Sequence, residues 1–110
     1  MTTNAYGLDD KLNTSGGAMS GTLTLKGTPA LIIPSGTNAC AGTAVLNGTT
    51  AVTVATTVVD TLSQIMLTTQ IPSGTVGTPY IFSKTNGVGF TIKSTSGSDA
   101  STVAWFIIEL

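Results

Sequence analysis

Few side chains in this sequence could carry acid–base or nucleophilic chemistry. Histidine is absent, which excludes imidazole general bases, His-ligated metal sites and Ser-His-Asp triads. Five carboxylates are present; Asp9 and Asp10 lie near the start, whereas Asp60 and Asp99 lie in turn-forming stretches. An Asp in a turn usually accepts hydrogen bonds from its own backbone. A glycosidase needs two carboxylates facing each other across a groove, and no aromatic sugar platform flanks Asp60 or Asp99. We therefore predict no catalytic residues and no enzymatic activity.

The single cysteine and the charge balance exclude further classes of site. Cys40 is alone, so neither an intrachain disulfide nor a multi-cysteine metal site can form, and its small neighbours indicate a packed residue. The net charge is −1, from four lysines, no arginine and five acids. Arginine is the side chain that grips phosphate with two parallel hydrogen bonds, so its absence argues against a nucleic-acid partner. No window resembles a membrane span. We expect no metal, cofactor, nucleic acid or membrane partner.

The composition predicts an all-β domain. At 110 residues the chain has room for one domain with a modest core. Apolar residues make up 41% but charged residues only 8%, against about a quarter in typical domains, and Thr, Ser and Gly fill the difference. Threonine is β-branched and suits a pleated, half-wetted surface. A surface with so little charge gains its solubility from hydroxyl groups or from burial in an assembly.

From residue 43 onward, short strand-like runs alternate with turn signals. Asn47-Gly48 and Asn86-Gly87 are the strongest short-range hairpin signals. Because short strands at this spacing pack as two sheets, we predict an antiparallel β-sandwich that is jelly-roll-like. The expected strands cover residues 43–47, 51–57, 64–70, 78–84, 89–94 and 102–109.

The last run, residues 101–110, is apolar on both faces, whereas a strand with one solvated face alternates apolar and polar residues. One row consists of Val103, Trp105 and Ile107, and the other includes Phe106 and Ile108. Since both rows need cover, we predict that one packs in the domain's own core. The other is expected to contact a second copy of the chain. The pattern leaves open which row does which.

Three aromatic side chains could stack on a ligand. Trp105 lies between Ala104 and Phe106 in the last run, and Tyr80 and Phe82 share one face of an expected strand. Aromatic residues in such settings supply large apolar contact area and more often belong to a core or an interface. We interpret all three in that way.

Ahead of the sandwich, the sequence predicts two further parts. The expected divisions are an N-terminal part at residues 1–27, a connector at 28–41 and the sandwich at 42–110. Tyr6, Leu8 and Leu12 are the large apolar side chains of a polar stretch. We interpret them as the contacts of an attachment arm that orders on docking to a larger body; the alternative is a frayed terminus.

Two short apolar patterns follow this arm. Residues 22–26 alternate cleanly, which predicts a strand with Leu23 and Leu25 facing inward. Residues 30–33 form an apolar run between prolines, which predicts an edge strand or an extended connector.

Two stretches resemble segments of bacteriophage proteins. Residues 16–25, Gly-Gly-Ala-Met-Ser-Gly-Thr-Leu-Thr-Leu, resemble the Gly-Gly-x-Met-[Thr/Ser]-Gly-x-Leu-x-Leu segment that recurs in tailed-phage fibre proteins, typically in intertwined trimeric stems or collars. Residues 42–109 are similar to a β-module found at the C-terminal ends of many phage structural proteins. Those modules also end in a Ser-Thr-Val-x-Trp-x-Ile-type strand, here at residues 101–107. Proteins with such modules are generally virion components and often trimers.

The resemblances imply a non-enzymatic structural protein of a phage virion. The chain start lacks the basic and apolar stretches of a signal peptide, so we expect synthesis in the host cytoplasm. The first interpretation is a homotrimeric capsid decoration (cement) or short head-fibre protein; the short chain favours it. Its arm would bind other virion proteins such as the major capsid protein. The alternative is a tail-fibre tip whose loops at 73–78, 85–88 and 95–100 contact a host-surface receptor.

Overall fold

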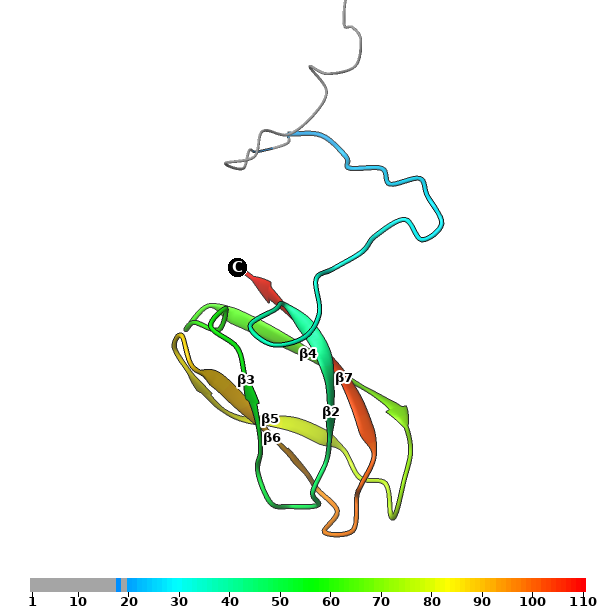
Figure 1. Ribbon diagram of the computed structural model, residues 1–110, viewed down its shortest axis with the longest axis vertical. Coiled ribbons are helices and arrows are strands. Elements are labelled where there is room, and N and C mark those ends of the chain that lie inside the picture. The colour runs from blue at the N-terminus through cyan, green and yellow to red at the C-terminus, as the bar shows by residue number, and fades with distance from the viewer. Residues whose placement is uncertain (1–17, 19) are drawn as a thin grey trace, which may run out of the picture. The chain divides into compact units, whose positions relative to one another are not determined.

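The computed structural model describes residues 18 and 20–110 (Figure 1). The chain divides into two units, Met1–Leu31 and Ile32–Leu110, and the second contains every strand of the described residues. These strands are β2 (Ala41–Val45), β3 (Val52–Ala55), β4 (Ser63–Ile71), β5 (Pro79–Thr85), β6 (Gly89–Ser94) and β7 (Thr102–Glu109). All six strands expected from the sequence are confirmed, with ends that shift by one or two residues.

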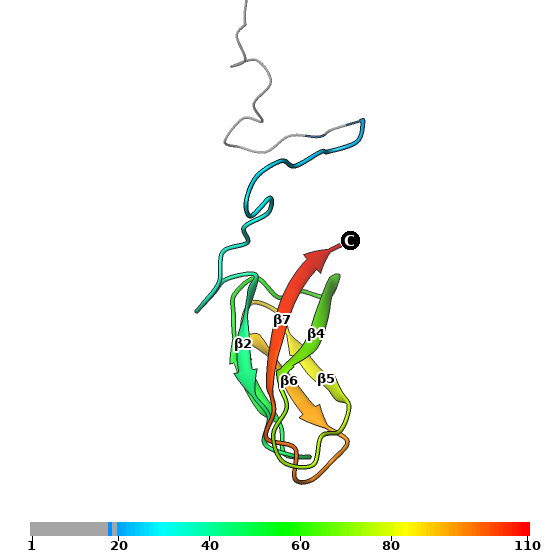
Figure 2. The same cartoon turned by 90° about the vertical axis from the view of Figure 1, so that its right-hand side faces the viewer.

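The strands form two three-stranded antiparallel sheets, ordered β2-β7-β4 and β3-β6-β5. Figure 2 shows β7 running between β2 and β4, with β5 and β6 of the second sheet behind. The prediction of an all-β antiparallel sandwich is therefore confirmed. Because β2 and β3 lie in different sheets, as do β4 and β5, both connections cross between the layers.

The core lies between the sheets and follows the alternation of the strands. On β6 and β7 every second side chain points inward, which is the period-two pattern of a strand that has one covered face. Residues of the loops complete the core at its ends. The buried hydrophobic residues are Leu46, Val59, Phe90, Ile92, Val103, Trp105 and Ile107.

The two Asn-Gly turns have different outcomes. Asn86-Gly87 closes the β5–β6 hairpin as expected, with Gly87 at φ 68° and the Val88 N–H donating to Thr85. Gly48, at φ 61°, also lies in a tight turn. However, its N–H donates to the Asp99 carbonyl and its carbonyl accepts from the Ser94 N–H, both at 2.9 Å. These bonds fix the turn against the β6–β7 loop, and the strands that leave it enter different sheets.

The alternating segment at residues 22–26 forms no strand in the structure, so that prediction is wrong. Leu23 is 61% exposed and Leu25 is 44% exposed, whereas both were expected to face inward. The pattern supplies an apolar row, but no strand of the described residues pairs with it. At residues 30–33 the structure shows an extended connector without strand pairing. The expected divisions at residues 27/28 and 41/42 stay predictions.

Candidate assembly surface

The last strand, β7, separates its two apolar rows. Val103, Trp105 and Ile107 are buried in the core, at 0%, 4% and 7% exposure. On the other side Phe106 is half-buried and Ile108 is 42% exposed. The structure thus assigns the core row, which the sequence pattern left open. A contact between copies of the chain through the other row stays a prediction.

Trp105 is held from two sides. Its ring meets Phe90 edge to face, with centroids 5.2 Å apart and an interplanar angle of 77°. Gly42 lies opposite Trp105 on β2, and a Cβ at that glycine would lie 2.8 Å from the indole Cζ2. The indole therefore packs directly on the β2 backbone, where only glycine leaves room. Trp105 is thus a core residue of the single chain.

The outer face of the β2-β7-β4 sheet, hereafter the β7 outer face, carries no charged residue. Cross-strand neighbours Met66 and Phe106 lie at its centre, with Gln64 beside Ile108. Val45 adds a further apolar side chain on β2, at 58% exposure. The outward positions are Ala41, Thr43 and Val45 on β2, Thr102, Ala104, Phe106 and Ile108 on β7, and Gln64, Met66, Thr68, Gln70 and, after a bulge, Ile71 on β4.

The outer face of the other sheet is different. Tyr80 is 41% exposed and Phe82 is 55% exposed, so neither lies in the core, and the interface alternative for these two residues stays a prediction. The β5 strand presents its alternate positions to solvent here, and no described element covers them. The Lys93 ammonium lies 3.5 Å from the centre of the Phe82 ring, which is a cation–π contact. This face therefore carries a charge, unlike the β7 outer face.

Asp99 is buried and connects the loops at one end of the sandwich. Its Oδ2 accepts from the Ser94 hydroxyl at 2.7 Å and from the Gly77 N–H at 2.9 Å, and its Oδ1 accepts from the Ser101 N–H at 3.0 Å. Hydrogen bonds from Ser101 and Ser94 hold the pKa of the Asp99 carboxyl well below its usual range. The sequence predicted only that Asp99 would accept hydrogen bonds within its own turn. The serines near it in the sequence, Ser94 and Ser101, were the signal that could have predicted its other hydrogen bonds.

The carboxylates of Asp60 and Asp99 do not face each other. Asp60 caps its own turn, accepting from the Leu62 N–H at 2.7 Å, just before β4 begins at Ser63. Ser63 pairs with Glu109 at the end of β7, whereas Asp99 lies before the start of β7. At about 3.3 Å per residue, the eight residues of β7 separate the two turns by more than 20 Å. The pair therefore cannot work as glycosidase carboxylates.

The remaining residues singled out from the sequence are the expected attachment contacts and the single cysteine. Tyr6, Leu8 and Leu12, the expected attachment contacts, lie outside the described residues, as do three residues of the fibre-like segment at 16–25, namely Gly16, Gly17 and Met19. Cys40 is half-buried and unbonded to sulfur. Within residues 18 and 20–110 there is no group of three or more His, Cys, Asp or Glu that could hold a metal ion. The same residues include no helix long and apolar enough to cross a membrane.

The comparisons with known proteins point to one family. The family model described as the C-terminal domain of K1 capsule-specific polysaccharide lyase matches residues 38–108. This span begins just before β2, ends one residue before the end of β7, and covers more than half of the chain. No curated protein and no solved structure matches the chain.

Proposed function

The chain belongs to the family of the K1 capsule-specific polysaccharide lyase C-terminal domain, and from this premise we propose that it is a non-enzymatic, fibre-type structural domain of a bacteriophage virion that assembles as a homotrimer. The family match covers the sandwich and is to the C-terminal domain of such a lyase. The resemblance of residues 16–25 to phage fibre segments supports the same class of protein.

The observation that carries the proposal is the uncharged β7 outer face. Protein surfaces usually carry charge, and the cores of interfaces are depleted in it and enriched in aromatic residues and methionine. Phe106 and Met66 provide these residue types at the centre of the face, and Ile108 extends the apolar area. The opposite outer face keeps Lys93 and suits contact with solvent. Each copy would turn its β7 outer face toward the other two around a threefold axis.

Replacing Phe106 with aspartate is expected to abolish the trimer while leaving the sandwich folded. The substitution places a charge at the centre of the proposed contact, where it would be desolvated without a partner. Loss of a hot-spot residue reduces the binding free energy by about 2 kcal/mol or more, which weakens self-association by roughly 30-fold or more. Light scattering or sedimentation at micromolar concentration measures the mass, and circular dichroism reports the fold.

The matched control is Phe82→Asp, which introduces the same charge at a more exposed aromatic residue on the opposite face. This variant should keep the trimer mass. A wild-type protein that is monomeric at micromolar concentration contradicts the proposed assembly. A Phe106→Asp variant that remains trimeric contradicts the proposed contact face.

Within the virion, the family membership supports a tail-fibre position over the head. The family is named after a lyase of the K1 capsule polysaccharide, and a protein that acts on a bacterial capsule works where the phage meets its host. We therefore place the domain in the tail fibre, with the capsid decoration protein as the competing assignment.

Labelling of phage particles with gold-conjugated antibodies against the domain should mark the tail fibres in electron micrographs. Purified domain in excess should also slow adsorption of the phage to its host cells. Label confined to the head, together with saturable binding of the protein to capsids that lack it, would overturn the tail position in favour of capsid decoration.

A further inference from the structure

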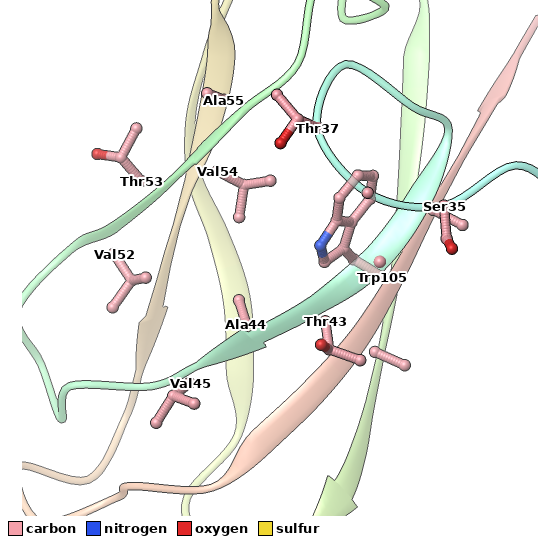
Figure 3. Close-up of a pocket in the computed structure, with 14 residues that line it drawn as sticks. Ser35, Thr37, Thr43, Ala44, Val45, Val52, Thr53, Val54, Ala55 and Trp105 are labelled. Atoms are coloured by element: carbon pink, nitrogen blue, oxygen red, sulfur yellow. The ribbon is translucent and has the colours of Figure 1, made fainter.

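A groove opens between β2 and β3, the neighbouring edge strands of the two sheets. Its volume is about 810 Å³, and Gly42, Ala44, Val54 and Trp105 are among the residues that line it. Figure 3 shows Ala44 and Val54 pointing toward the indole of Trp105, whereas Val45 and Thr53 point away from the groove. The bottom of this β2–β3 groove is therefore apolar, and its two rims are strand edges.

The rim on β2 carries free backbone groups. The Cys40 carbonyl accepts from the Ile107 N–H at 2.8 Å, and the Leu46 N–H donates to the Ser101 carbonyl at 2.9 Å. Even-numbered residues of β2 thus bond to β7. Since bonding direction alternates along a strand, the N–H and C=O groups of Thr43 and Val45 point toward the groove.

The rim on β3 repeats the arrangement. The Thr56 N–H donates to the Val88 carbonyl at 3.0 Å, so Thr56 and the even-numbered residues before it bond toward β6. The backbone groups of Thr53 and Ala55 therefore point the other way, toward β2. Within the described residues β2 pairs only with β7, apart from a bridge at Ala41, and β3 pairs only with β6. Two unpaired strand edges thus face one another.

Trp105 adds a polar group that also lacks a partner. Its indole Nε1 is buried and has no hydrogen-bond acceptor among the described residues. Figure 3 shows the nitrogen on the side of the ring that faces the groove. A buried donor without an acceptor costs free energy, so an occupant that brings an oxygen atom would stabilise the domain.

We propose that the β2–β3 groove receives residues 22–26 of a second copy of this chain as an inserted strand. The segment alternates Leu23 and Leu25 with threonines, so an extended conformation turns both leucines to one face. Both leucines are exposed, and within residues 18 and 20–110 no strand pairs with the segment. Its five residues equal the length of β2. Inserted between the rims, it would pair with both edges and place its leucines over Ala44, Val54 and Trp105.

The insertion specifies how the copies connect. Each copy has one segment to donate and one groove to fill, so the exchange closes either as a reciprocal two-fold dimer or as a ring. A ring of three copies satisfies every segment and every groove, and this step rests on the proposed homotrimer. The edges that would otherwise recruit foreign strands are then covered.

Disulfide trapping in a Cys40→Ala background tests the proposal. One chain carries Thr24→Cys on the segment, and a co-expressed, size-tagged chain carries Thr43→Cys or Thr53→Cys on a rim. Thr24, Thr43 and Thr53 all face away from the core in the inserted arrangement, which brings neighbouring Cβ atoms within disulfide range. We expect a mixed, reductant-sensitive dimer with at least one rim variant. The control is a tagged Ser83→Cys chain, whose exposed cysteine on β5 should give at least 10-fold less.

The outcomes separate this inference from the proposed function. Trimers without the mixed dimer would overturn the strand insertion and leave the homotrimer standing. In a chain that carries both Thr24→Cys and Thr43→Cys, a cross-link within the chain, without the mixed dimer in the two-chain experiment, would also overturn it, because the occupant would then be the chain's own segment. A monomeric wild-type protein would remove both proposals.

Hydrogen exchange at the single indole gives a second measurement that does not depend on cross-linking geometry. Trp105 is the only tryptophan, so one indole N–H signal reports on the groove. Replacing Leu25 with aspartate should speed exchange of this proton about 10-fold or more, because the groove would lose its occupant. Unchanged exchange in a variant that has kept its fold would overturn the proposal.

Discussion

Trp105→Ala is expected to lower the free energy of unfolding by about 3–5 kcal/mol, the range for removing a large buried aromatic side chain. The indole fills the space between Gly42 and Phe90 and is 4% exposed, so its removal leaves a cavity that the two sheets cannot readily close. A domain of this size has a total stability of about 5–15 kcal/mol, so the variant would be marginal. Urea unfolding followed by far-ultraviolet circular dichroism measures the change, since the variant has no tryptophan fluorescence.

The neighbouring substitution Phe106→Ala provides the comparison, because Phe106 lies on the same strand but in the outer row. Its effect on the isolated domain should be about 1 kcal/mol or less, with the main loss in self-association. Both variants must be compared at one protein concentration, since assembly adds to apparent stability. If Trp105→Ala cost less than Phe106→Ala in the isolated domain, the assignment of the core row would be contradicted.

The second large effect is expected at Asp99. Asp99→Ala would leave the Ser94 hydroxyl and the N–H groups of Gly77 and Ser101 without their acceptor in a buried site. Unsatisfied buried donors are costly, and we expect the melting temperature to fall by about 10 °C or more. Asp60→Ala is the matched control: Asp60 is exposed and caps one N–H in its own turn, so its loss should shift the melting temperature by only a few degrees, roughly.

The same carboxylate makes stability depend on pH. The folded-state pKa of Asp99 lies below the value of about 3.9 for an unfolded Asp, so folding favours the ionised form. The stabilisation is fully present above about pH 4 and declines as the pH falls below this value toward the folded-state pKa. Melting curves between pH 2 and 6, roughly, should show this acid loss in the wild type and a weaker one in Asp99→Asn. Equal acid sensitivity in the two proteins would contradict the role of Asp99.

The strands were predictable because turn chemistry and alternation are local. Asn86-Gly87 specifies a tight hairpin turn, and β6 and β7 have the expected bounds of 89–94 and 102–109. Asn47-Gly48 carries the same local signal, but its outcome depends on the hydrogen bond that Gly48 donates to Asp99 and the one it accepts from Ser94, both of which are distant in sequence. The sheet to which a strand belongs is thus decided by contacts that no short window contains.

The assembly surface, too, could be predicted from the sequence only in part. Both rows of β7 are apolar, so hydropathy cannot tell which row lies in the core. The core row is specified by Gly42 on the neighbouring strand, because its missing side chain leaves room for the indole of Trp105 on one face of the sheet only. Tyr80 and Phe82 were expected in a core or interface, and they lie on an outer face rather than in the core, which residue type alone cannot reveal. The absence of charge on the β7 outer face could have been found once the six strands and their period were assigned, since it needs no long-range contact.

The loops tied to Asp99 also limit how this domain can diversify. The Thr75 N–H donates to Ser98 and the Ala100 N–H donates to Ser73, so the β4–β5 and β6–β7 loops are joined through their backbones. An insertion or deletion in one loop would break the ladder that holds the other. Sequence changes at this end of the sandwich should therefore preserve both loop lengths and be confined to exchanges of outward side chains.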